Sequence, residues 1–165
     1  MQDLVLREAT NADIPTIVAL VHAAFEEYRG KLDPPSGAHR ETEGTVRRLM
    51  SSTRVVIALA AGEPSGCVFY EQAEDQLSFS RLAVRPEYRR RGIGRALIAY
   101  VEDQARALKV GGIRLGVRIA LTRLRAYYER LGYRLVQYCN HDGYEMPTYV
   151  ILEKALPPRN SSEGN

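Results

Sequence analysis

Residues 82–97 of the chain read Leu82-Ala-Val-Arg-Pro-Glu-Tyr-Arg-Arg-Arg-Gly-Ile-Gly-Arg-Ala-Leu97. A strand-like segment ends at Arg85-Pro86, a short loop with glycines follows, and a helical apolar pattern begins at Ile93. A helix that starts directly after a strand and loop aims its free N–H groups and the positive end of its dipole at one spot. Glycines let a ligand approach the backbone there. Five arginines surround that spot: Arg85, Arg89, Arg90, Arg91 and Arg95. The stretch therefore predicts a site for a diphosphate-sized anion.

The spacing of the glycines indicates which type of anion-binding motif is present. A dinucleotide fingerprint requires G-x-G-x-x-G, but Leu97 stands at the third glycine position, and the Gly-Lys-Ser/Thr of a P-loop is missing. The pattern that is present is R-x-x-G-x-G, from Arg89 to Gly94. Further along, a predicted helix ends in Tyr128-Glu-Arg-Leu-Gly-Tyr133.

With these two motifs in this order, the chain resembles the GNAT superfamily of acyl-CoA-dependent N-acyltransferases. The predicted element order, β-α-α-β-β-β-α-β-α-β-β over residues 1–156, is similar to that family as well. The resemblance implies an α+β (mixed α/β) fold in a single domain spanning residues 1–156. Its central sheet would be mixed, mostly antiparallel and about seven-stranded, splayed between the strands around Ala83 and Val117, and flanked by four helices. The polar tail 157–165 is expected to be disordered.

Hydrophobic periodicity gives the bounds of these elements. The first helix should follow Thr10 or Asp13, and a second should cover residues 41–50 with Val46, Leu49 and Met50 facing inward. A long helix should bury one face, made of Ile93, Leu97, Tyr100, Val101, Gln104 and Leu108. Residues 121–131 form the last predicted helix, with Gly132 as its C-terminal cap. The strands are predicted at residues 4–7, 55–60, 66–70, 76–84, 113–119, 133–138 and 149–156, with residues 61–65 as a hairpin turn.

The resemblance also implies a co-substrate, acetyl-CoA, and the residues that hold it. The backbone of Leu82, Ala83 and Val84 would pair with the pantetheine arm. Amides of the following loop would hold the pyrophosphate, with Arg95 opening the helix beside it; these loop residues are Arg89, Arg90, Arg91, Gly92, Ile93 and Gly94. Tyr128 matches the family's usual general acid, close to the thioester sulfur. No metal is expected.

Two positions depart from the family pattern, and the acceptor side is less defined. Leu121 stands where the family often has Asn, and the strand 76–84 offers no carboxylate base at its centre. Glu26 and Tyr28 lie before a Pro-rich loop that walls the acceptor site in related folds, so they could receive a cationic amine. A solvated helix face is the alternative for these two residues. Cys139 and His141 superficially suggest a nucleophile and a base, but neighbours on a turn point apart.

Composition limits the remaining function classes. The chain has 165 residues and a net charge of +3, and no apolar run reaches the ~18 residues that a membrane span needs. The first residues do not form a basic segment followed by an apolar one, as a signal peptide would, and the chain has only two cysteines. We therefore expect a cytoplasmic protein.

The predicted activity is transfer of the acetyl group of acetyl-CoA to a primary amine, on a small molecule or peptide, by direct attack. A non-catalytic acyl-CoA sensor of the same fold is the alternative. Nucleic acid is disfavoured because no aromatic residues interleave the arginines. No membrane partner is expected, and a homodimer is left open.

Overall fold

The structure is a computed structural model that describes residues 3–157, and this part of the chain forms seven strands and four α-helices. The helices are α1 (Ile14–Phe25), α2 (Glu43–Leu49), α3 (Ile93–Leu108) and α4 (Thr122–Arg130). The strands are β1 (Leu4–Glu8), β2 (Arg54–Ala60), β3 (Glu63–Ala73), β4 (Gln76–Val84), β5 (Gly112–Arg118), β6 (Arg134–Cys139) and β7 (Tyr149–Ala155). Short 3₁₀ turns are η1 (Asn11–Asp13), η2 (Glu26–Tyr28), η3 (Gly37–Arg40) and η4 (Pro86–Tyr88). The predicted element order is confirmed.

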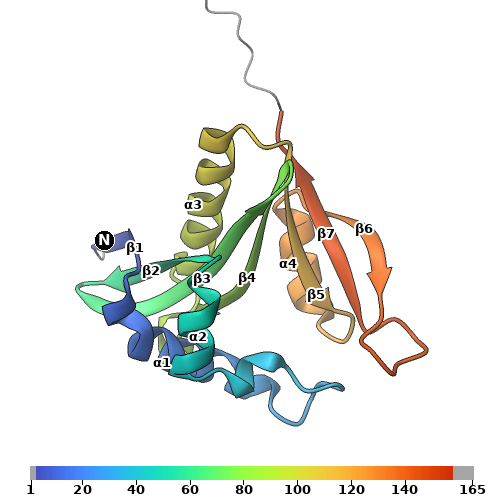
Figure 1. The fold of residues 1–165 in the computed structure, drawn as a ribbon, viewed down its shortest axis with the longest axis horizontal. Helices are drawn as coiled ribbons and strands as arrows, with labels where there is room; N and C mark the ends of the chain where they lie inside the picture. Colours follow the sequence, from blue (N-terminus) through green and yellow to red (C-terminus); the bar gives the residue numbers. More distant parts are fainter. Residues whose placement is uncertain (1–2, 158–165) are drawn as a thin grey trace, which may run out of the picture. The chain divides into compact units, whose positions relative to one another are not determined.

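The strands form one mixed sheet in the order β1-β2-β3-β4-β5-β7-β6 (Figure 1). The pairs β1–β2, β2–β3, β5–β7 and β7–β6 are antiparallel, whereas β4–β5 is parallel and is connected through α3. The parallel ladder is short, joining Gln76–Ser78 to Gly112–Arg114. The mixed, mostly antiparallel sheet expected from the sequence is therefore confirmed. Ala83 and Val117 lie beyond that ladder, and the splay expected between them stays a prediction.

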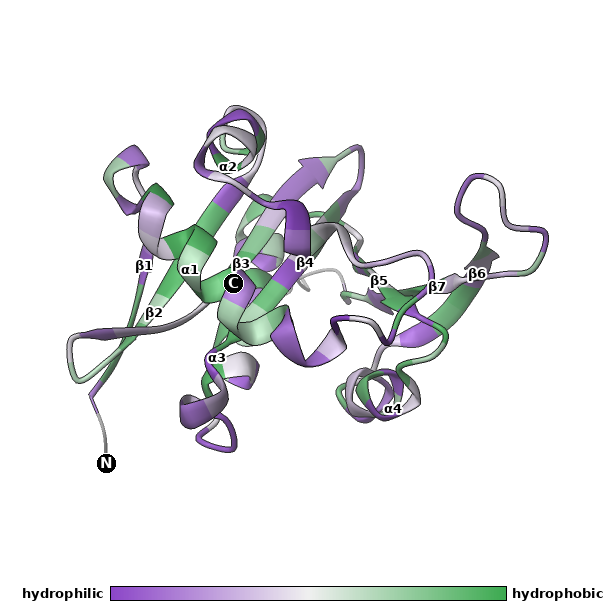
Figure 2. Cartoon of the chain, turned by 90° about the horizontal axis from the view of Figure 1, so that it is seen from below, coloured by the Kyte–Doolittle hydropathy of each residue, from purple (hydrophilic) through white to green (hydrophobic). Residues whose placement is uncertain are grey.

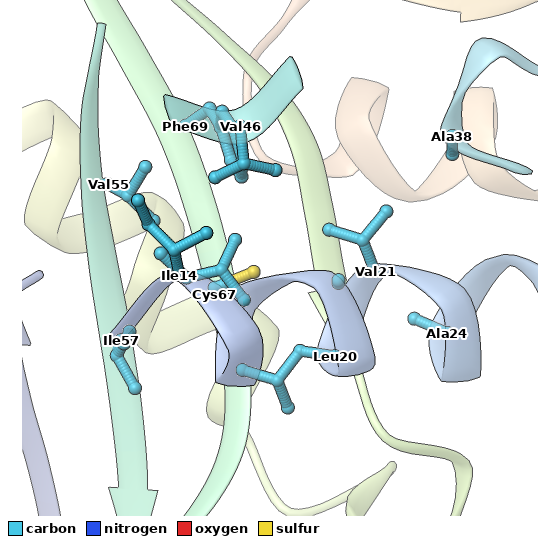
Figure 3. Close-up of a cluster of buried hydrophobic side chains, with 12 residues drawn as sticks. Ile14, Leu20, Val21, Ala24, Ala38, Val46, Val55, Ile57, Cys67 and Phe69 are labelled. Carbon is cyan, nitrogen blue, oxygen red and sulfur yellow. The ribbon is translucent and has the colours of Figure 1, made fainter. Parts of the chain in front are cut away.

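The chain divides into two compact units, and unit 1 comprises residues 3–71 and 79–101 of the described part. Its core forms where α1 lies on β2 and β3 (Figure 3). Each Val, Leu, Ile or Phe side chain that is fully buried in this core contributes about 1.5–3 kcal/mol to the stability of the fold. Burial raises the pKa of the Cys67 thiol to about 12, so this cysteine is a protonated core residue rather than a nucleophile. The core side chains drawn include Ile14, Leu20, Val21, Val46, Val55, Ile57, Cys67 and Phe69.

Unit 2 comprises residues 72–78 and 102–157 of the described part. Its centre is β7, which pairs with β5 on one side and β6 on the other. Ile113, Leu115 and Val117 alternate along β5 and are buried, while Gly116 and Arg118 lie on the opposite face. The loop between β6 and β7 is largely hydrophilic (Figure 2). One face of this ribbon is thus packed and the other is available to polar groups.

Some expectations about helix faces and turns were wrong. Leu49 and Leu108 were expected inside but are 37% and 48% exposed, because each is the last residue of its helix, where the chain turns away. On α3, Ile98 and Ala105 are buried instead of Leu108. The hairpin turn is also shorter than expected, because β3 already begins at Glu63, so that only two residues, Ala61 and Gly62, separate the strands. Apart from residue 157, the tail expected to be disordered lies outside the described residues.

Candidate active site

The predicted strand–loop–helix junction is present in unit 1. The strand β4 ends at Val84, η4 follows, and α3 begins at Ile93. The first hydrogen bond into the helix runs from the Ala96 N–H to the Gly92 carbonyl oxygen at 3.0 Å, so the amides before Ala96 have no acceptor within the helix. Gly92 has φ +80°, and a Cβ atom built there would meet no other atom within 4 Å. The backbone is therefore open to a ligand at Gly92, as an anion site at a helix start requires.

The arginines of this junction differ in what they contact. Arg89 donates to the Glu27 carboxylate at 2.8 Å and to the Ala24 carbonyl oxygen at 3.0 Å, both at the end of α1. The Arg91 guanidinium lies over the Tyr88 ring, 5.2 Å from its centroid. Arg90 and Arg95 are exposed. Since Arg89 joins the loop to α1, its main contacts are to protein groups.

The end of β4 holds the residues expected to meet the pantetheine arm. Ala83 is buried, whereas Leu82 and Val84 are partly buried. Just before them, Arg81 has φ +51°, which is the left-handed conformation found at β-bulges, where a strand bends. The Arg81 guanidinium donates to the buried Glu41 carboxylate at 3.2 Å. This ion pair joins the bend to the loop before α2.

Tyr128 is positioned in unit 2 by the C-terminal cap of α4. The Gly132 N–H donates to the Glu129 carbonyl oxygen at 3.0 Å, and the Tyr133 N–H donates to the Tyr128 carbonyl oxygen at 3.2 Å. This pair of bonds is a Schellman motif, with Gly132 left-handed at φ +98°, so the predicted glycine cap is confirmed. The Tyr128 and Tyr133 rings meet edge to face at 6.1 Å. Tyr128 is only 4% exposed, and the cap fixes its backbone.

The two residues suggested for the acceptor lie in η2, at the end of α1. The single Nε–H of Arg29 is shared between the two Glu26 carboxylate oxygens, at 2.9 and 3.0 Å. Burial and the neighbouring Glu27 carboxylate raise the pKa of Tyr28 to about 12, which keeps its hydroxyl protonated. Because Arg29 is bound to Glu26, the negative charge of Glu26 is already compensated within the protein.

A surface cavity that sequence reasoning did not find lies in unit 2. Its volume is about 380 Å³, and its lining residues are Gly116, Arg118, Asn140, His141, Asp142 and Tyr149. The sequence signal here was the turn that carries Cys139 and His141, which indicates a loop but no ligand. Among the residues that the structure describes, there is no group of three or more His, Cys, Asp or Glu side chains that could hold a metal ion. Within the same residues, no helix is long and apolar enough to cross a membrane.

The fold is of the mixed α/β class, and the start of a helix directly after a strand and loop is a place where phosphate groups commonly bind in proteins. Comparison with known proteins then gives the family. The sequence model of the acetyltransferase (GNAT) family matches residues 17–133, so the chain belongs to this family. The family consists of acyltransferases, and acetyl-CoA is its co-substrate. None of the curated proteins compared matches the chain.

Solved structures show the same fold at low sequence identity. PaiA N-acetyltransferase from Thermoplasma acidophilum, in complex with coenzyme A, superimposes with a TM-score of 0.78 at 17% identity, covering 93% of this chain and 99% of that one. The ribosomal-protein-S18-alanine N-acetyltransferase from Escherichia coli gives 0.75 at 20% identity, covering 96% and 98%. Ard1 from Thermoplasma volcanium gives 0.75 at 17% identity, covering 93% and 98%.

Proposed function

We propose that this protein transfers the acetyl group of acetyl-CoA to a primary amine, by direct attack when both substrates are bound. The observation that supports this best is the open backbone at Gly92, at the start of α3. The family of the chain and the coenzyme A bound to the Thermoplasma acidophilum relative agree with it.

The residues of the junction fit a pyrophosphate. The amides before Ala96 offer donors without helical acceptors, and Gly92 adds no side chain to block a phosphate. Arg90 and Arg95 are exposed and can add charge-assisted hydrogen bonds. We assign Arg89 a smaller share than its place in the motif suggests, because its guanidinium is bound to Glu27 and Ala24.

The proposed reaction uses a backbone N–H, the Tyr128 hydroxyl and water. The amine nitrogen forms a bond to the acetyl carbon while the bond from that carbon to sulfur breaks. A backbone N–H of the segment Leu82–Val84 stabilises the negative charge that develops on the acetyl oxygen. Tyr128 gives its phenolic proton to the departing sulfur, the amine proton leaves to water, and solvent returns a proton to the Tyr128 phenolate. Atoms and charge balance as an amide and a free thiol.

Replacing Gly92 with Glu tests the site. A carboxylate beside the phosphates adds like-charge repulsion of several kcal/mol, so acetyl-CoA binding should weaken at least ~100-fold by calorimetry. Gly62→Glu is a matched control, because Gly62 has φ +82° and equally open surroundings but lies in the β2–β3 turn. The control carries the same backbone strain and charge and should bind normally. Equal affinities for wild type and Gly92→Glu would overturn the proposal.

Assaying free thiol release with a panel of primary amines separates an enzyme from a sensor. Wild-type protein should release coenzyme A only when both acetyl-CoA and a suitable amine are present. Acetyl-CoA binding without release for any amine would favour the non-catalytic sensor.

A further inference from the structure

The cavity of about 380 Å³ lies entirely within unit 2, between the end of β5, the start of β7 and the β6–β7 loop. Small-molecule sites commonly span ~300–1,000 Å³, so this volume is near the lower end of that range. Gly116 has no side chain, which leaves space on its face of β5 beside the Tyr149 ring. The volume of the cavity therefore favours a small organic molecule as its ligand.

The loop that borders this cavity is held by its own hydrogen bonds. The Asn140 Nδ2 donates to the carbonyl oxygens of Tyr144 and Glu145, each at 3.0 Å. The Thr148 Oγ1 accepts from the His141 N–H at 2.9 Å and also contacts the His141 Nδ1. The His141 ring meets the Tyr149 ring edge to face at 5.0 Å. A site that is already ordered loses less entropy when it binds a ligand.

The lining carries both signs of charge next to one tyrosine. Arg118 is the direct cross-strand partner of Tyr149, so their side chains are adjacent, and the Arg118 Nε is buried. A hydrogen bond with Cys139, burial and the negative charge of Asp142 raise the pKa of Tyr149, so its hydroxyl remains protonated and can donate. The Tyr149 ring is therefore near a guanidinium and near a carboxylate. A guanidinium binds a carboxylate with two parallel hydrogen bonds, and a carboxylate attracts an ammonium.

We propose that this cavity binds the acetyl acceptor, and that the acceptor is a free amino acid or a similarly small zwitterion. Arg118 holds its carboxylate and Asp142 holds its ammonium group before the amine loses a proton and reacts. This inference rests on the proposed function, because it names the substrate class of that reaction. A plain amine would place no anion against Arg118, and a dicarboxylate would face Asp142 with like charge.

The test compares each amino acid with matched analogues. The twenty L-amino acids are titrated into the protein by calorimetry without acetyl-CoA, and those that bind are compared with their decarboxylated amines and deaminated acids. At least one amino acid should bind at least ~10-fold more tightly than both of its analogues, since each analogue lacks one charge-assisted contact. Arg118→Gln and Asp142→Asn should each weaken that binding by a similar factor.

Arg114→Gln is the matched control for the arginine. Arg114 lies two residues before Gly116 on the same face of β5, but it pairs with Glu153 at 3.1 Å and does not line the cavity. Its replacement removes the same charge and should leave amino-acid binding within about twofold. Thermal unfolding of all three variants checks that the fold persists.

The outcomes separate this inference from the proposed function. Absence of binding for all twenty amino acids, equal binding of an amine analogue, or unchanged affinity in Arg118→Gln would overturn the assignment of the cavity. In that case thiol release with other amines would leave the acetyltransferase proposal standing. Conversely, amino-acid binding that depends on Arg118 and Asp142, with no thiol release for any amine, would show a zwitterion site but would contradict both its role as the acceptor site and the transfer reaction.

Discussion

At the scale of single residues, the proposed role of Tyr128 as general acid can be tested by one substitution. Replacing it with Phe keeps the ring and its edge-to-face contact with Tyr133, so stability should change little. The phenolic proton is lost, and general acids typically contribute ~10²–10⁴-fold to a rate. We expect kcat to fall at least ~10-fold, after partial rescue by water, with acetyl-CoA affinity within a few-fold. Steady-state kinetics and calorimetry measure both quantities.

Tyr127 provides the control for that substitution. Its ring lies next to that of Tyr128 at 5.5 Å, but it projects from α4 about 100° further round the helix. Tyr127→Phe should therefore keep nearly full kcat. A Tyr128→Phe enzyme with the wild-type rate across the pH range would contradict the role of Tyr128 as the acid.

Arg89 leads to a prediction about stability rather than chemistry. Its guanidinium contacts Glu27 and the Ala24 carbonyl oxygen at the C-terminal end of α1, where a positive charge is favourable. The Arg89 and Glu27 side chains are partly exposed, so solvent screens the pair and Arg89→Gln should cost about 1 kcal/mol of unfolding free energy in urea titrations. Arg90→Gln, at an exposed position, should cost less than ~0.5 kcal/mol. Equal stabilities of the two variants would mean that the Arg89 contacts contribute nothing measurable.

The position of Gly92 and the glycine cap at Gly132 could be predicted because both depend on local sequence: the first on the strand–loop–helix order, the second on the end of a helical pattern. The role of Tyr128 is implied only by the family resemblance and stays a prediction. The partners of Arg89 could not be predicted in this way, because Glu27 is 62 positions away and only the folded chain brings them together. The cavity near Tyr149 was missed for the same reason, since it joins residues of β5 to a loop more than twenty positions later.

At the scale of elements, the start of α1 depends on one carboxylate. Asp13 accepts two hydrogen bonds from the Arg7 guanidinium at 2.8 Å and one from the Thr10 N–H at 2.8 Å, which joins β1 to η1. These bonds, first those from Arg7, lower the pKa of Asp13 to about 2. The ordinary value in an unfolded chain is about 3.9. Because the folded pKa is the lower one, the unfolded state binds more protons in the acid range, and stability decreases as the pH falls.

Asp13→Asn should therefore lose stability in a pH-dependent way. Above about pH 5 the variant should be less stable than wild type by about 1 kcal/mol, allowing for the solvent exposure of Arg7. The difference should shrink as the pH falls from about 5 to 2, where Asp13 becomes protonated in both states. Asp103→Asn, in an exposed helical pair with Arg106, should change stability by less than ~0.5 kcal/mol. A constant difference between wild type and Asp13→Asn from pH 7 to pH 2 would contradict this interpretation.

Element types could be predicted from the sequence more fully than element ends. The helical repeat of α1 and the alternation of β4 are strong local signals, and β4 has the predicted bounds. The β2–β3 hairpin extends further than predicted because its register shifts by one residue at Ala58 and Leu59, which places Pro64 opposite Leu59. A bulge of this kind depends on pairing with the neighbouring strand, and Pro64 alone suggests a turn.

At the scale of the whole molecule, a net charge of +3 and the arginines near α3 leave two anionic partners to distinguish. Coenzyme A has a small fixed number of phosphates, whereas a duplex presents a dense row and releases bound counterions. The structure disfavours a nucleic-acid duplex as the partner, because Arg89 is bound to Glu27 and Arg91 lies over Tyr88.

Salt dependence tests this distinction directly. Five arginines on a duplex would give a slope of roughly −4.5 in log affinity against log salt, or a loss of about 500-fold between 50 and 200 mM salt. Acetyl-CoA affinity should instead fall by about tenfold or less over that range, because only Arg90, Arg95 and uncharged backbone amides are proposed to meet its pyrophosphate. Calorimetry with acetyl-CoA, and fluorescence anisotropy with a labelled 20-base-pair duplex, measure the two dependences. Tight duplex binding with the steep slope, together with no acetyl-CoA binding, would make nucleic acid the partner of this arginine cluster and remove the acetyltransferase proposal.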